Sequence, residues 1–192
     1  MTTLSPRSDV ISSAGRAAHE LGVAALIGGN LFAREAMHPA LAEIADERER
    51  GKVLNAAWRR YGRVNSAALA AVVGGWAAAR AGESRPGLLS ARERQVALAK
   101  DGAVVAVAVT GVASAVAGVS FARSSPDGAV PMRDGDAPAA DAGKRATRLK
   151  GAARTLGALH LASAVALGVA NSTLSQLSFR RPPARRLLRR RY

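Results

Sequence analysis

The chain contains no cysteine, so disulfide bonds and cysteine-ligated zinc or iron–sulfur sites are excluded. Aromatic residues make up only 4% of the sequence, although hydrophobic residues together reach 48%. Large side chains supply much of the burial energy of a soluble core, and they are scarce here. Small apolar residues instead suit membrane helices, because they let neighbouring backbones approach one another closely.

Acidic residues are also few, with 14 aspartates and glutamates against 28 lysines and arginines. This basic balance suits either nucleic acid or an anionic membrane surface as a partner, and the distribution of the charges has to decide between them. The N-terminal segment 1–13 is polar, and no short apolar region follows a basic start, so the chain is not expected to begin with a cleavable signal peptide.

Apolar stretches occur four times along the chain. The clearest runs from Gly102 to Ala122 without a charge or a polar stripe, and it is long enough to cross a hydrocarbon core of about 30 Å. We therefore predict an all-α integral membrane protein with about four transmembrane helices in a membrane domain that covers 14–179. The expected spans are 14–35, 62–81, 101–122 and 155–179. The first is the weakest, because Glu20 and Asn30 lie within it.

The predicted spans are joined by segments of different character. Segment 39–61 carries apolar residues at helical spacing among charges, which predicts an amphipathic helix at the membrane surface or an extension of the second span outside the membrane. Ser90 and Glu93 form a capping-box pattern that predicts a helix start at Ser90. Segment 124–143 is rich in Pro, Gly, Asp and Ala and is predicted to be a flexible loop.

The C-terminal segment 180–192 is rich in arginine and contains no acid. Directly after a hydrophobic helix, this composition predicts contact with anionic lipid headgroups. The residues concerned are Arg180, Arg181, Arg185, Arg186, Arg189, Arg190 and Arg191. With the tail included, lysines and arginines divide evenly between the two sides of a four-span arrangement. The density of the tail then decides the orientation, and both termini are expected on the cytosolic side of the cell (inner) membrane.

Small residues recur at every fourth position in each predicted span, a pattern that favours tight helix packing. An Ala-rich sequence also produces such rows by chance, so both interpretations stay open. The glycines predicted to pack are Gly29, Gly75, Gly118 and Gly168. Helix packing of this kind indicates a homo-oligomer or a complex with another membrane protein, in addition to the lipid bilayer itself.

No catalytic, metal or cofactor site is predicted, since the sequence has no phosphate-binding glycine loop and no Ser/His/Asp or paired-carboxylate arrangement. Polar side chains within the spans are nevertheless functional candidates. They are His19, Glu20, Asn30, His160 and Asn171. Each also has a structural interpretation, as a hydrogen-bonded histidine, a helix-terminal acid or an interhelical amide. His19 and His160 are expected at different depths, so they should not share a ligand, and His38 is expected at the interface.

Two of the predicted spans carry a resemblance to known families. The residues are His19-x-x-Gly22 with Gly28-Gly29-x-x-Phe32 in the first span, and Leu159-His160 with Asn171 in the fourth. In these short motifs the chain resembles small bacterial four-helix membrane families of unknown function and, more distantly, copper-resistance protein D-like membrane domains. The resemblance implies a four-helix membrane fold. It reaches the other two helices only through the number of helices, and it transfers no copper or redox site.

Three functions are compatible with these patterns. The leading hypothesis is a non-enzymatic membrane protein that acts through helix–helix contacts as a subunit, assembly factor or scaffold. The second is a small transporter or a redox or metal-handling membrane subunit that uses the polar residues of the spans. The third is a soluble, basic, nucleic-acid-binding helical protein, which is disfavoured because the stretch from Gly102 to Ala122 would need to be hidden from water.

Overall fold

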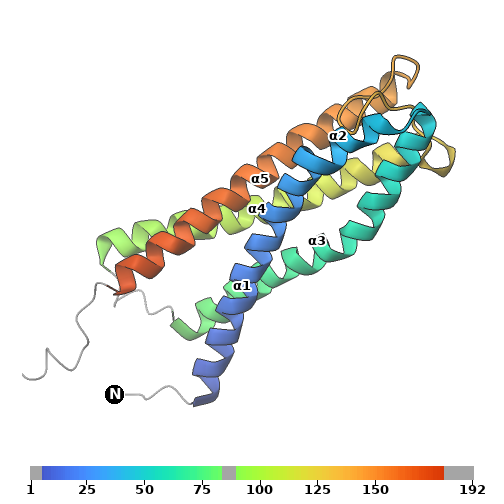
Figure 1. Ribbon diagram of the computed structural model, residues 1–192. Coiled ribbons are helices and arrows are strands. Elements are labelled where there is room, and N and C mark those ends of the chain that lie inside the picture. Colours follow the sequence, from blue (N-terminus) through green and yellow to red (C-terminus); the bar gives the residue numbers. More distant parts are fainter. Residues whose placement is uncertain (1–5, 84–89, 180–192) are drawn as a thin grey trace, which may run out of the picture.

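Figure 1 shows a computed structural model that describes residues 6–83 and 90–179, and within these ranges the fold is all-helical, as predicted. Its four long helices are α1 (Pro6–Phe32), α3 (Glu47–Glu83), α4 (Ala91–Ala122) and α5 (Lys144–Phe179). Short helical turns connect them: η1 (Ala33–Met37), α2 (His38–Ala40) and η2 (Leu41–Glu43) before α3, and η4 (Pro126–Gly128) before α5. The tail arginines from Arg180 onwards lie outside the described residues.

The long helices form two antiparallel hairpins. Helix α1 packs along α3, and α4 packs along α5, while α1 also touches α5 and α3 touches α4. The hairpins converge at the end that holds α2 and the α4–α5 connection, and their other ends diverge (Figure 1). The main core lies between the hairpins and takes two residues from each long helix: Val23, Leu26, Ala68, Val72, Val104, Val107, Ala164 and Leu167.

The capping box predicted before α4 is confirmed. The Ser90 hydroxyl accepts a hydrogen bond from the Glu93 backbone N–H at 3.3 Å, and the Glu93 carboxylate accepts one from the Ser90 N–H at 2.8 Å. Two of the N–H groups that a helix start leaves unpaired are thereby satisfied. The start of α4 is therefore set outside the apolar stretch.

The helices extend further than the apolar stretches from which they were predicted. Helix α3 is continuous from Glu47 to Glu83, so most of the predicted amphipathic segment 39–61 and the predicted second span form one helix. Helix α5 starts at Lys144, well before the predicted 155, and α1 starts at Pro6. The extra turns of α3 and α5 are rich in Ala, Arg and Lys, which are good helix formers, and their charges lie outside the uncharged stretches.

The connection from α4 to α5, predicted to be a flexible loop at 124–143, is packed against the bundle. Val130 and Met132 are almost fully buried. They join a second core cluster, at the convergent end of the hairpins, with Leu41, Leu54, Phe121 and Ala146. Composition alone did not reveal this anchor, because two large apolar side chains among many small polar residues are enough to form it.

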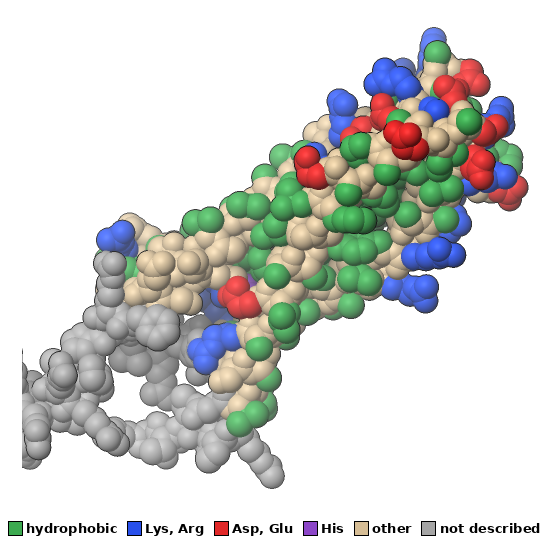
Figure 2. All heavy atoms as spheres, viewed as in Figure 1, with side chains coloured by type: hydrophobic (Ala, Val, Ile, Leu, Met, Phe, Trp, Pro, Cys, Tyr) green, Lys and Arg blue, Asp and Glu red, His purple; other side chains and the backbone are tan. Residues whose placement is uncertain are grey.

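Two of the described helices, α4 and the Lys144–Leu177 part of α5, are long and apolar enough to cross a membrane. Only 28% of the most apolar window of α4 is buried, and only 17% of that of α5. Large apolar side chains line the outside of α4 at alternating spacings of four and three residues: Val105, Val109, Val112, Val116 and Val119. On the face seen in Figure 2, charged side chains gather at the convergent end of the hairpins, and the middle is largely uncharged.

Candidate functional site

Two of the predicted candidates, His19 of α1 and His160 of α5, join the two helices of their own hairpins. The His19 Nδ1 atom lies 2.7 Å from the Val72 carbonyl oxygen on α3, and the His160 Nδ1 atom lies 3.2 Å from the Val107 carbonyl oxygen on α4. A carbonyl can only accept, so each imidazole donates its Nδ1–H. Both rings are buried, with 2% and 3% of their surface exposed.

Each of these histidines lies against a glycine of the facing helix, His19 through its backbone and His160 through its ring. A Cβ atom added at Gly75 would come within 2.8 Å of the His19 backbone nitrogen, and one added at Gly111 within 2.9 Å of the His160 ring. We call each set of histidine, carbonyl and facing glycine a histidine joint. Both hairpins thus contain a histidine bonded to a carbonyl of the facing helix and a glycine beside it. Each joint requires glycine at this position, because a side chain would collide with the histidine residue.

The four glycines predicted to pack lie in different environments. Gly75 belongs to a histidine joint, and Gly29 faces the Tyr61 ring, whose hydroxyl donates to the Ala25 carbonyl at 3.0 Å. Gly168 has ordinary contacts, with Val23 at 3.7 Å. Nothing lies within 4 Å of a Cβ added at Gly118, so the described part of the chain packs no helix against that position.

The remaining polar candidates do not converge on one site. Glu20 is exposed although its neighbour His19 is buried, so these two residues do not form a pair. Asn30 donates its side-chain amide to the Leu26 carbonyl of its own helix at 2.8 Å. Asn171 is 4% exposed, and neither its amide nitrogen nor its amide oxygen has a hydrogen-bond partner in the structure. Asn171 is therefore the polar side chain with the least satisfied environment.

Replacing Asn171 with leucine tests whether its amide binds a partner in the native protein. A buried amide without partners costs about 1–3 kcal/mol, whereas leucine has a similar volume and no polar atom. We expect Asn171→Leu to raise the thermal unfolding temperature of the protein in detergent, and Asn30→Leu, which breaks an existing bond, to give no such gain. A lower unfolding temperature for Asn171→Leu would mean that the amide binds a partner in the native protein.

A polar contact between the hairpins escaped the sequence analysis. The Asp101 carboxylate of α4 accepts a hydrogen bond from the Trp76 indole N–H of α3 at 2.8 Å and pairs with the Arg80 guanidinium at 2.8 Å. This group lies where the apolar stretch of α4 begins. Nothing in the spacing of these residues along the chain indicates that they meet.

The segment 128–139, which we call the clasp, is fastened to the first turns of α3. The Met132 N–H donates to the Glu47 carbonyl at 2.9 Å, and the Arg50 guanidinium donates to the Arg133 carbonyl at 2.6 Å. One turn later, the Asn55 side-chain amide donates to the Gly128 carbonyl at 2.7 Å. The clasp thus ties the second hairpin to the first at their convergent end.

The clasp carries the half-exposed Asp136, which meets the buried His38 in an ionisable cluster with Lys150. The His38 Nδ1 atom is 2.9 Å from a carboxylate oxygen of Asp136, and His38 is 8% exposed. The Lys150 side chain of α5 is 7% exposed, and its ammonium group lies 5.6 Å from the centre of the Phe121 ring. Burial lowers the pKa of Lys150 to about 8, and burial together with the Lys150 charge lowers the pKa of His38.

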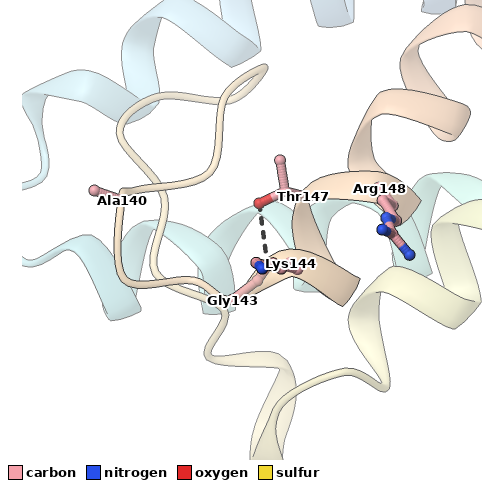
Figure 3. A pocket seen from close by; sticks show the side chains of 5 residues that line it. All are labelled: Ala140, Gly143, Lys144, Thr147 and Arg148. Carbon is pink, nitrogen blue, oxygen red and sulfur yellow. Dashed lines mark hydrogen bonds between the residues drawn. The ribbon is translucent and has the colours of Figure 1, made fainter.

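The described part of the clasp end holds a surface recess and no cluster of side chains suited to a metal ion. No group of three or more His, Asp or Glu side chains suited to a metal ion occurs in residues 6–83 and 90–179. A surface recess at the start of α5 is lined by Ala140, Gly143, Lys144, Thr147 and Arg148 (Figure 3). Among the lining residues, the Thr147 hydroxyl donates to the Gly143 carbonyl at 3.1 Å. Its two cations are exposed, so the recess is part of the solvated surface.

No significant match to this chain is found among family models, curated proteins or solved structures. The resemblance to copper-resistance protein D-like domains therefore stays a prediction.

Proposed function

We propose that the chain is a multi-pass membrane protein with about four spans that acts, without catalysis, through helix–helix contacts as a subunit, assembly factor or scaffold. The observation that carries this proposal is the low burial of the apolar windows of α4 and α5, at 28% and 17%. A buried core helix of a soluble protein would be mostly covered by its own chain. Uncovered apolar helices need lipid or another apolar helix against them.

Charged residues at the ends of the helices support four spans. Each long helix has an uncharged stretch bounded by charged side chains, apart from Glu20 within the stretch of α1. The bounding residues are Arg16 and Arg34 for α1, Arg63 and Arg80 for α3, Asp101 and Arg123 for α4, and Arg154 before the stretch of α5. Arginine side chains at these levels can reach the headgroups, which extends the shorter stretches across the bilayer.

The proposed orientation puts both termini in the cytosol and the clasp on the opposite side of the inner membrane. The start of α1 and the end of α5 lie at the divergent end of the bundle (Figure 1), and the arginine tail would lie among anionic headgroups on that side. In this arrangement, the outer part of α3 carries Trp58 and Tyr61 near the membrane surface. These two rings contact each other edge to face at 6.0 Å.

Membrane fractionation of cells that express the chain with a C-terminal reporter, active only in the cytosol, tests the proposal. We expect the protein to pellet with membranes, to resist carbonate extraction and to give an active reporter. Protein in the high-speed supernatant would contradict membrane insertion and would direct attention to nucleic acid as a partner of the basic tail. A pelleted protein with a silent reporter would contradict the orientation or the even number of spans.

A second candidate, a small transporter or a redox or metal-handling subunit, is favoured by the bare polar atoms inside the bundle. The Nε2 atoms of His19 and His160 and both amide atoms of Asn171 have no hydrogen-bond partner in the structure. A transported ion, a metal or haem could occupy such groups. Absorption spectra and metal analysis of the purified protein decide between the candidates, since a bound chromophore or metal that is lost in His160→Ala would favour this second function.

A further inference from the structure

We propose that the clasp is a pH-sensitive latch, which closes over neutral His38 and releases from the first hairpin when His38 takes up a proton. The released state would expose the contact between the two hairpins at their convergent end. The proposal does not depend on the orientation of the chain or on its partners.

The clasp holds His38 by its side chain and by its backbone. The Asp136 carboxylate accepts from the His38 Nδ1–H at 2.9 Å, and the Gly135 N–H donates to the His38 carbonyl at 3.1 Å. A Cβ atom added at Gly135 would overlap His38, so the clasp backbone lies directly against this residue. A change in the charge of His38 therefore acts directly on the residues of the clasp.

The charged groups around His38 disfavour a positive charge on its ring. Lys150 of α5 and Arg34 of η1 act on it as positive charges, and Asp136 of the clasp acts as a negative one. Asp136 and Asp134 also compensate Lys150, which in addition is repelled by Arg154. The negative charges of the two clasp carboxylates thus already help to compensate the buried ammonium group of Lys150. Protonated His38 would place a second buried cation beside Lys150.

His38 also has an Nε2 atom that is buried and has no hydrogen-bond partner in the structure. Neutral imidazole with its proton on Nδ1 leaves Nε2 as an acceptor, whose desolvation costs far less than that of a bare N–H⁺. Protonation would create this N–H⁺ donor in a place without an acceptor. The closed geometry is therefore built around the neutral ring.

The direction of the pH dependence follows from linkage. Burial, followed by the Lys150 charge, lowers the pKa of His38 below its ordinary value of 6.5 in the closed state. Release of the clasp returns the group to water, so the open state binds more protons, and acidification below pH 6.5 favours the open state. Lys150, with a pKa of about 8 in the closed state, stays protonated between pH 5 and 7 and adds no pH dependence there.

Hydrogen–deuterium exchange on the full chain in lipid nanodiscs, at pH 7.0 and pH 5.0, tests the latch. After correction for the intrinsic exchange rates, we expect residues 128–139 to lose protection at pH 5.0, by up to about tenfold for each unit by which the closed state lowers the pKa of His38. A peptide around Ala164 in the main core serves as the internal reference and should keep its protection.

Two variants complete the test. His38→Gln keeps an amide donor for Asp136 but does not titrate, so the clasp should be equally protected at both pH values. Lys150→Met keeps the length of the side chain and removes the competing cation, so the loss of protection at pH 5.0 should be smaller than in the wild type. The latch is contradicted if the wild-type clasp keeps its protection at pH 5.0, or if the acid response persists in His38→Gln.

Discussion

Val112→Lys is expected to make insertion of α4 less favourable by about 2.5–3.5 kcal/mol if α4 crosses the bilayer. The fraction of chain that is correctly inserted and folded should fall accordingly. Val112 lies near the centre of the uncharged stretch of α4 and is 56% exposed. It has lipid or another apolar helix beside it in a membrane, and it has only water beside it in a soluble bundle. The same substitution would therefore be harmless or even favourable for a soluble protein, so its effect distinguishes the two classes.

The matched control for this experiment is Val53→Lys on the part of α3 outside the predicted spans. Val53 is 41% exposed, and its neighbours in the sequence include Lys52. We expect the control to be neutral in both the amount of membrane-inserted protein and its unfolding temperature. Equal behaviour of the two variants would show that α4 does not lie in an apolar environment.

Gly75→Leu is expected to destroy the packing of α1 on α3, whereas Gly118→Leu should leave the fold intact. A Cβ atom at Gly75 would meet the Gly15 carbonyl and the His19 backbone, which are rigid parts of the facing helix. Overpacking of this kind costs about 1–3 kcal/mol when side chains can yield, and more when only backbone is available to move. Thermal unfolding in detergent, followed by circular dichroism, measures the difference between the two variants.

The same pair of variants tests the proposed role in assembly. Among residues 6–83 and 90–179, no other helix comes within 4 Å of a Cβ atom built at Gly118, so a leucine there should mainly disturb what lies against the outside of α4. If the protein acts through the outer face of α4, Gly118→Leu should weaken oligomer formation or partner capture without lowering the unfolding temperature. Normal assembly by this variant would mean that the interface lies on another face of the bundle.

Much of the fold was predictable because its signals are local. The uncharged stretch in α4 and the capping box at Ser90 each reflect a few neighbouring residues and a single helix. The extra turns of α3 were indicated by apolar residues at helical spacing in 39–61. Those of α5 could not be predicted from hydrophobicity, since the charged residues from Lys144 to Arg154 interrupt the apolar stretch. Four spans and an orientation remain predictions, because the apolar measure alone identifies only α4 and α5.

The candidate site was predictable only in part. Sequence reasoning selected His19, His160 and Asn171, and the structure buries all three between helices. It did not reveal the acceptors of the histidines, because Val72 and Val107 contribute their carbonyl oxygens and carry no polar side chain. The cluster of His38, Asp136 and Lys150 was missed altogether, since each residue comes from a different element and no spacing rule connects them.

The clasp also has a consequence for the order in which the chain is assembled. Its hydrogen bonds join residues 73 to 98 positions apart, as in Asn55 with Gly128 and His38 with Asp136. Helices α1 and α3 can pair as soon as both have left the ribosome, but Leu41 and Leu54 stay uncovered until Val130 and Met132 have been synthesised. During this interval the first hairpin presents an apolar surface in water at its loop end. Closure of the clasp is thus the step at which that surface is withdrawn from chaperones and proteases.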